Sequence, residues 1–260
     1  MIARASVVGG GARTALGRSL GACAAAVRAR VGNVGPHPFF SNAHGRRMSV
    51  ARAAWLPDRL IGGARLANLA RNATKEALAS IDRGGEDARV RAFVGVAEPR
   101  PGAGDEIVGE VMAAVTAGAA GRLEGVSAVR AGHAGSLVAI EQALSALERG
   151  DADLCLAGGV DSWLDLDALE WLAAEGRIHD RRRPYGFIPG EGAAFCLLAS
   201  PRWLAARGVT SVLGVVAAAS AVEPAPRGSS SVCVGKGLGA AFAGALAPLR
   251  ARAARVTRMI

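Results

Sequence analysis

The stretch at residues 125–162, GVSAVRAGHAGSLVAIEQALSALERGDADLCLAGGVDS, decides the fold of this chain. Its first six residues are typical of a strand, and the continuous apolar run at 154–159 is typical of a second, buried strand. Between them, apolar residues recur at helical spacing from Leu137 to Leu147, and Gly150 is placed to end the helix. The pattern strand, turn, helix, strand predicts two parallel strands in one sheet.

Short apolar runs and Ala-rich helical runs alternate along the rest of the chain. We predict strands at 5–9, 92–97, 193–199 and 211–218, and helices at 17–31, 59–81, 105–118, 164–174, from Pro201, and 236–247. Residues 32–57 contain three prolines and are predicted to be a loop. Gly9-Gly10-Gly11 are expected to form a tight turn from strand to helix. This alternation predicts an α/β fold, with a mainly parallel sheet and helices on both faces.

Composition excludes several classes of protein. The chain has 260 residues, and a hydrophobic share of 51% excludes a disordered protein. No apolar run approaches the ~20 residues that a membrane span needs, and the N-terminus does not match an export signal. The net charge is +9, but the arginines are scattered and aromatic residues for base stacking are scarce. We therefore expect no membrane partner and no nucleic-acid partner.

The cysteines and acidic residues predict no metal site. The four cysteines have no C-x-x-C spacing, which predicts a reducing cytoplasm without disulfides or zinc. Cys155 and Cys196 lie in apolar strands and are expected to be inert core thiols. The acidic residues around the start of the helix at 164–174 are expected to cap it; they are Asp161, Asp165 and Asp167. The histidines in Pro- or Arg-rich segments are expected to be exposed; they are His37, His44 and His179.

The turn at 131–136 is the best place for chemistry in the sequence. Free N–H groups and the helix dipole favour an anion there, and a cysteine at such a turn would be a ready thiolate. This chain presents His133 instead. Ser136 does not fit the G-x-S-x-G pattern of serine hydrolases, and its spacing from His133 is not that of a Ser–His pair.

Two ordered motifs resemble the β-ketoacyl-ACP synthase family. Residues 131–162 resemble the segment around its nucleophile, A-C-S-S-S-L-x-A-I, a helix, and then G-D-A-D-x-x-L-A-G-G. Residues 183–194, RPYGFIPGEGAA, resemble its later R-P-F…D-G-F-V-x-G-E-G-A run. The resemblance implies the thiolase-like layered fold, which the full family builds from two similar halves. Residues 1–208 would form a domain like the N-terminal half, and 209–260 the partial start of the second half with an Arg-rich tail.

The resemblance also implies a chemistry. Family members condense an acyl thioester with malonyl-ACP in fatty-acid or polyketide synthesis; a cysteine takes the acyl chain, two histidines assist decarboxylation, and backbone amides hold the oxyanion. Alignment on Ser136-Leu137 places the family cysteine at His133, as a catalytic position without a good nucleophile. The residues implied to bind substrate are Gly132, Ala134, Gly135, Phe187 and Gly190. No cofactor and no metal are expected.

The departures from the family pattern shape the functional prediction. No histidine follows His179, and nothing after residue 200 resembles the family's H-G-T-G-T motif. We predict a degenerate or partner-type homologue in the cytoplasm that binds an acyl carrier protein and forms a homodimer, or a heterodimer with an active synthase. The alternatives are an active acyltransferase completed by a partner subunit and, less favoured, a basic nucleic-acid-binding protein. We expect either a natural short homologue or a truncated or frame-shifted gene product, and the sequence leaves both open.

Overall fold

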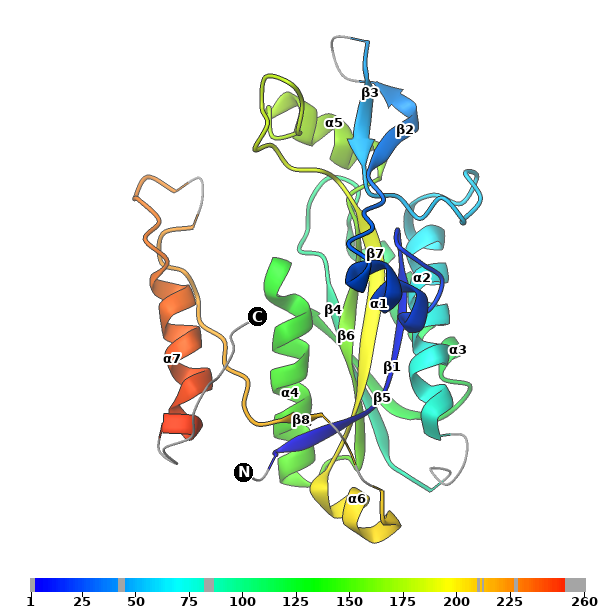
Figure 1. Cartoon of the computed structure of the whole chain (residues 1–260), viewed down its shortest axis with the longest axis vertical. Helices are drawn as coiled ribbons and strands as arrows, with labels where there is room; N and C mark the ends of the chain where they lie inside the picture. The colour runs from blue at the N-terminus through cyan, green and yellow to red at the C-terminus, as the bar shows by residue number, and fades with distance from the viewer. Residues whose placement is uncertain are drawn as a thin grey trace.

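A computed structural model of the chain describes residues 3–41, 45–81, 87–209, 211, 213–226 and 229–250. The strands are β1 (Ala5–Thr14), β2 (Gly35–Ser41), β3 (Arg47–Val50), β4 (Val90–Val96), β5 (Leu123–Arg130), β6 (Leu154–Ser162), β7 (Glu191–Ala199) and β8 (Gly214–Val215). The helices are α1 (Leu20–Arg28), α2 (Gly62–Leu78), α3 (Asp105–Gly118), α4 (Gly135–Arg149), α5 (Leu166–Ala174), α6 (Pro201–Arg207) and α7 (Lys236–Arg250), with 3₁₀ turns η1 (Ala79–Ile81) and η2 (Gly132–Ala134). Figure 1 shows their arrangement.

The central sheet is mixed. Its strand order is β5-β4-β6-β7-β1-β8; β4 is parallel to β5 and β6, whereas β7 is antiparallel to both β6 and β1. The predicted α/β fold with helices on both faces is confirmed, but the prediction of a mainly parallel sheet is wrong. The chain leaves β6 at Ser162 and enters β7 at Glu191, which pairs with Ser162. Helix α5 therefore lies beyond the end of the sheet and does not cross its face (Figure 1).

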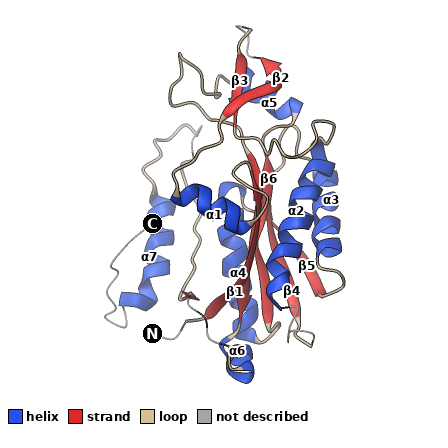
Figure 2. Cartoon of the chain, turned by 45° about the vertical axis from the view of Figure 1, so that its right-hand side comes forward, coloured by secondary structure: helices blue, strands red, loops and turns tan. Residues whose placement is uncertain are grey.

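Crossover handedness places the helices. The connections β4–α3–β5 and β5–α4–β6 run in opposite directions across the strand order. Because such crossovers are right-handed, α3 and α4 must lie on opposite faces of the sheet. Helix α2 lies beside α3, and Figure 2 shows this pair on one side of the strands and α4 on the other.

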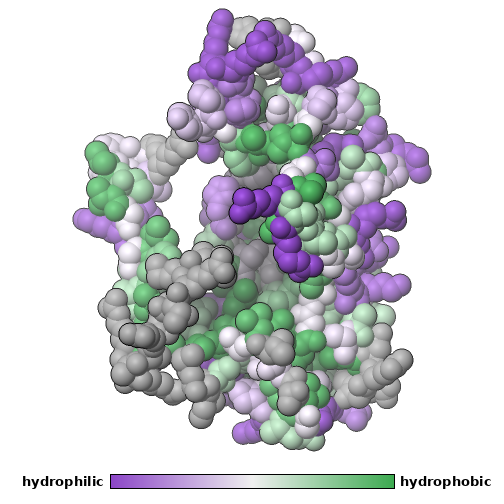
Figure 3. Space-filling model, viewed as in Figure 1, coloured by the Kyte–Doolittle hydropathy of each residue, from purple (hydrophilic) through white to green (hydrophobic). Residues whose placement is uncertain are grey.

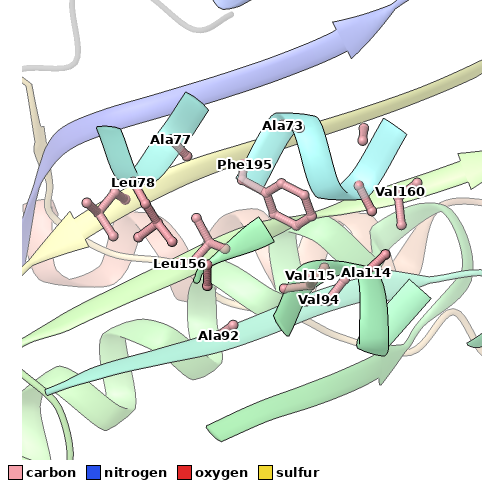
Figure 4. Close-up of a cluster of buried hydrophobic side chains, with 14 of the residues drawn as sticks. Ala73, Ala77, Leu78, Ala92, Val94, Ala114, Val115, Leu156, Val160 and Phe195 are labelled. Atoms are coloured by element: carbon pink, nitrogen blue, oxygen red, sulfur yellow. The ribbon is translucent and has the colours of Figure 1, made fainter. Parts of the chain in front are cut away.

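The larger core lies under α2 and α3. Figure 4 shows alanines of the two helices meeting branched and aromatic side chains of the strands. Leu156 and Phe195, from β6 and β7, are buried between them. The small helix residues let the helices approach the sheet closely, so that the large strand side chains fill the layer between them.

The glycine run in β1 serves this close approach. Gly9-Gly10-Gly11 lie inside the strand, so the expected tight turn is wrong. A Cβ added at Gly11 would lie 2.0 Å from the carbonyl oxygen of Ala73 in α2, and one at Gly9 would lie 2.6 Å from that of Ala77. These glycines are therefore needed because the backbone of α2 rests directly on β1.

Two further predicted segments differ from the structure. The predicted loop at 32–57 contains the antiparallel hairpin β2–β3, in which Met48 and Val50 are buried against residues of α5. The prolines are tolerated because β2 is an edge strand, where a residue without a backbone N–H need not remove a hydrogen bond between strands. Of the strand predicted at 211–218, only Gly214–Val215 pairs with β1, while Thr210 and Val212 lie outside the described residues.

Helix α7 stands apart from the body of the molecule. Figure 3 shows open space between the upper part of the region around α7 and the rest of the chain. Leu238 and Phe242 of α7 are exposed apolar residues. Among the helices that the structure describes, none is long and apolar enough to cross a membrane.

Candidate functional site at the entry of helix α4

The predicted turn between strand and helix is present. β5 ends at Arg130, η2 follows, and α4 begins at Gly135. Gly132 has φ +50°, a conformation in which a side chain would be strained. His133 follows it and is exposed. The turn thus holds the imidazole at the N-terminal end of α4, where the Ala134 and Gly135 backbone N–H groups donate to the Ala131 and Gly132 carbonyls.

Glycines form the floor beneath this helix end. A Cβ at Gly95 of β4 would lie 2.6 Å from the backbone nitrogen of Ser136. A Cβ at Gly159 of β6 would lie 2.3 Å from the Ser136 hydroxyl oxygen and 2.8 Å from the Gly95 carbonyl oxygen. The first turn of α4 therefore rests on bare backbone of two strands, which fixes its height above the sheet.

An open cavity of about 610 Å³ lies in front of this floor. Its walls come from the ends of β4, β6 and β7, from the start of α4, and from Thr14 and Leu20. Of the predicted site residues, Gly132, His133 and Gly135 line it. Ala134 is exposed and is not part of this wall. The volume falls within the range of ligand sites, roughly 300–1,000 Å³.

A second cavity, of about 240 Å³, lies on the other side of His133. Gly132, His133 and Asp161 line both cavities, so the histidine forms part of the wall between them. The His133 and Trp163 rings are nearly parallel, at 18°, with centroids 6.2 Å apart. The imidazole thus has an aromatic neighbour on one side.

Arg100 holds this aromatic wall in place. Its guanidinium carbon lies 3.7 Å from the centroid of the Trp163 ring, at cation–π distance. Its Nη2 donates to Asp161 Oδ1 at 2.6 Å and to the Ser162 carbonyl at 2.8 Å. Its Nε is buried without a hydrogen-bond partner among the described residues. The charge of Arg100 is therefore balanced by Asp161.

The two predicted residues of the later motif support this wall from outside. Phe187 packs edge-on against Trp163, with centroids 5.3 Å apart. The Gly190 carbonyl accepts a hydrogen bond of 2.9 Å from the Trp163 backbone nitrogen. Neither residue lines the two cavities beside His133. In this structure they position Trp163, which in turn lies next to His133.

Sequence reasoning missed Arg100 and Trp163. Both follow parallel strands, as His133 does: Arg100 comes shortly after β4, His133 after β5 and Trp163 after β6. Because the carboxyl ends of parallel strands meet at one edge of a sheet, the predicted strands already placed the three segments together. That signal was in the sequence, although the stacking geometry was not.

None of the thiols near the site has the environment of a nucleophile. Cys155 is buried in β6, as predicted, and burial raises the pKa of its thiol to about 12. Cys196 is partly buried and lines the larger cavity, so its predicted place in the core is wrong, whereas its predicted inertness is supported by its environment. Its Sγ donates to the Ala157 carbonyl at 3.3 Å, and burial raises its pKa to about 11. Both thiols stay protonated near neutral pH, whereas a nucleophile must be a thiolate.

The other candidate residues take structural places. Asp165 is the N-cap of α5 and accepts from the Asp167 backbone nitrogen, as predicted. His37 is half-buried, which corrects the expectation that it is exposed, and His179 is also half-buried. His44 lies outside the described residues. No cluster of three or more potential metal ligands occurs in the described part of the chain.

The sequence matches the model of the β-ketoacyl synthase N-terminal domain over residues 69–202, just over half of the chain. This chain belongs to the β-ketoacyl synthase family. The matched residues include the unit β5–α4–β6, all the residues that line the second cavity, and His133. No curated protein matches the sequence significantly.

Solved ketosynthases share the fold. A type II polyketide ketosynthase, solved in complex with its acyl-carrier protein and bound to the hexaketide, matches with a TM-score of 0.72 at 15% identity, over 94% of this chain and 70% of that one. The ishigamide ketosynthase/chain length factor matches with 0.69 at 19% identity, over 94% and 70%. A β-ketoacyl synthase from Burkholderia phymatum STM815 matches with 0.72 at 21% identity, over 96% and 71%. At these identities the likeness establishes the fold of the chain alone.

Proposed function

We propose that this chain is a non-condensing member of the β-ketoacyl synthase family that acts as the partner subunit of an active synthase. The observation that carries the proposal is His133, which stands at the helix entry where the family motif has its cysteine. An acyl-imidazole is labile and is poorly suited to holding a growing chain. The thiols of Cys155 and Cys196, which are protonated near neutral pH, offer no substitute.

The edge of the sheet supports a dimer. β5 is the outermost strand of the central sheet, and the described residues leave its outer edge without a partner strand. A free edge of eight residues is a template for pairing with another chain. The family resemblance implies dimerisation through this strand, which would place the His133 turn beside the partner. One solved relative is itself a ketosynthase/chain length factor.

The charge supports an acyl carrier protein as a further partner. A net charge of +9 suits an acidic carrier, because opposite charges steer association. A cavity of about 570 Å³ between β3 and the loop after α5 is lined by arginines; they are Arg46, Arg47, Arg181 and Arg183. Figure 3 shows hydrophilic residues covering this end of the molecule. Carrier binding through this surface should weaken as salt is added.

We also propose that residues 1–208 form the N-terminal-like domain and that 209–260 begin a second half. In support, the family match ends at residue 202, and α7 lies apart from the sheet. The cytoplasm is the proposed compartment, in keeping with the cysteine spacing and with a carrier-dependent pathway.

Co-expression with the ketosynthase encoded nearest to this chain tests the proposed function. The complex is purified, its mass is measured by light scattering, and it is then incubated with acyl- and malonyl-loaded carrier protein. We expect a heterodimer in which peptide mapping finds the acyl group on the cysteine of the partner. An acyl group on this chain, or a 3-oxoacyl product formed by this chain alone, would show an active acyltransferase instead.

A further inference from the structure

A third cavity, of about 360 Å³, lies between the β2–β3 hairpin, the start of α2 and the start of α5. These three segments are far apart in the sequence and meet beyond the end of the sheet (Figure 1). The cavity shares no lining residue with the two cavities beside His133. It is therefore a separate site of a size that suits a small ligand.

Apolar side chains form most of its walls. They come from β2, from the segment that leads into α2, and from α5; they are Phe39, Phe40, Leu60, Ile61, Leu164 and Leu166. Phe39, Ile61 and Leu166 are exposed although they are large and apolar. Large apolar side chains that gather around a hollow, and not singly, mark a binding site.

The cations in the walls, Arg52 and Arg65, are already paired within the protein. Arg52 forms an ion pair with Asp58. Arg65 forms two hydrogen bonds of 2.7 Å with the carboxylate of Glu191, and both side chains are buried. Asp165 caps α5. An anionic ligand would meet no unpaired cation among the described lining residues, would face the Asp165 carboxylate and would lose its hydration, so the cavity favours an uncharged ligand over an anion.

His37 supplies one directional group. Its Nδ1 accepts from the backbone nitrogens of Phe39, at 3.2 Å, and Phe40, at 2.9 Å. An Nδ1 that accepts carries no proton, so the proton of the neutral ring is on Nε2. Burial and the nearby Arg52 and Arg47 lower the pKa of His37, which keeps the ring neutral. Nε2–H has no partner among the described residues and remains as a hydrogen-bond donor.

We propose that this cavity binds one uncharged aliphatic acyl compound, whose carbonyl oxygen accepts from His37 Nε2 while its chain lies among the leucine and phenylalanine side chains. The site is distinct from the His133 cavities and does not depend on the proposed function. It does adjoin them: successive residues at and just beyond the end of β6 alternate, with Asp161 and Trp163 in the wall beside His133 and Ser162 and Leu164 in the wall of this cavity.

Titration calorimetry on the isolated chain, without partner or carrier, tests this site. The probe is octanamide, and octanoate is the charged comparison. We expect octanamide to bind saturably at one site, and octanoate to bind at least about tenfold more weakly, because its carboxylate would be buried without a counter-ion. No saturable binding of octanamide, or equal binding of octanoate, would overturn the proposal.

Two variants and a control locate the ligand. His37→Asn keeps an oxygen that accepts from the backbone nitrogens of Phe39 and Phe40 but removes the Nε2–H donor, and should weaken octanamide about tenfold. Leu166→Trp fills the mouth at a position that is 56% exposed, and should abolish binding. The control Val27→Trp adds the same ring at a 63% exposed position of α1 outside the cavity, and should change nothing. Unchanged binding in Leu166→Trp would place the ligand elsewhere, and unchanged binding in His37→Asn would remove the donor from the proposal.

Discussion

On one face of the sheet, α2 and α3 lie side by side and cover the strands, whereas α4 lies on the other face. Within α4, Leu144 is completely buried but Leu137, two turns earlier, is 69% exposed. The face under α2 and α3 holds the larger core, and the face under α4 holds His133 at the entry of that helix. The face under α2 and α3 therefore contributes most of the buried core, whereas the face under α4 leaves the helix entry and the outer surface of its first turns exposed.

The buried ion pair under the start of α2 should give the largest effect on stability. Arg65→Met removes the cation and leaves the Glu191 carboxylate buried, so the free energy of unfolding should fall by about 3 to 5 kcal/mol. The control on the same helix is Arg71→Met, at an exposed position, which should change the stability by less than about 0.5 kcal/mol. Urea unfolding measures both. Equal losses in the two variants would contradict a special role for the buried pair.

The two leucines of α4 test the second face directly. Leu144→Ala opens a cavity in the smaller core and should cost about 3 kcal/mol. Leu137→Ala should cost less than about 0.5 kcal/mol in the isolated chain, because its side chain is already in water. Thermal and urea unfolding report both values. A large loss from Leu137→Ala would mean that the outer surface of α4 is covered in the isolated chain.

The glycine contact between β1 and α2 should give an intermediate effect. Gly11→Ala forces a methyl group toward the Ala73 carbonyl, which cannot move without shifting α2, so about 1 to 3 kcal/mol should be lost. Gly109 in α3 has open space around its Cβ position, and Gly109→Ala should instead add about 0.5 to 1 kcal/mol. A neutral Gly11→Ala variant would show that α2 does not rest on β1.

The smallest effect concerns the pH dependence of stability at the edge of the molecule. The hydrogen bonds from Arg89 hold the pKa of Asp153 below its usual 3.8. Because the folded pKa is depressed, this pair contributes stability above the unfolded pKa and loses it as the pH falls through the folded value. Above pH 3.8 the wild type should therefore have a slightly larger free energy of unfolding than Asp153→Asn, and this difference should vanish at lower pH.

Unfolding by urea over a pH series checks this, and the same experiment with Arg89→Gln should show the same convergence. If the difference in free energy of unfolding between the wild type and Asp153→Asn grew as the pH fell, it would have the wrong sign and could not come from the Arg89–Asp153 pair.

Local patterns in the sequence predicted most of the elements. The predicted helix 105–118 matches α3, because Asp105 and Glu106 mark its first turn and apolar residues recur along it. The strand, turn and helix around His133 were also predicted, since a run of β-type residues, a glycine turn and a helical period are all local signals. Placing His133 at the entry of α4 followed from these alone.

Features that depend on contacts between distant residues could not be predicted. The direction of β7 depends on where the chain re-enters the sheet, opposite Ser162, and not on the residues of β7. The role of Gly11 depends on Ala73 in a helix some 60 residues away. The predicted strands place the segments of Arg100 and Trp163 at one edge of the sheet, but the stacking of these two side chains depends on the pairing of β4 with β6 and could not be predicted.

Acylation of position 133 is the most direct test of the account. The chain and its His133→Cys variant, both carrying Cys233→Ser to remove the exposed thiol, are incubated with an octanoyl thioester and their intact masses are measured. We predict no stable adduct on the chain with His133, and one octanoyl group on the variant, mapped to residue 133. A stable octanoyl group on the chain with His133, or an unmodified His133→Cys variant, would contradict the proposal that His133 occupies the place of the family nucleophile without its reactivity.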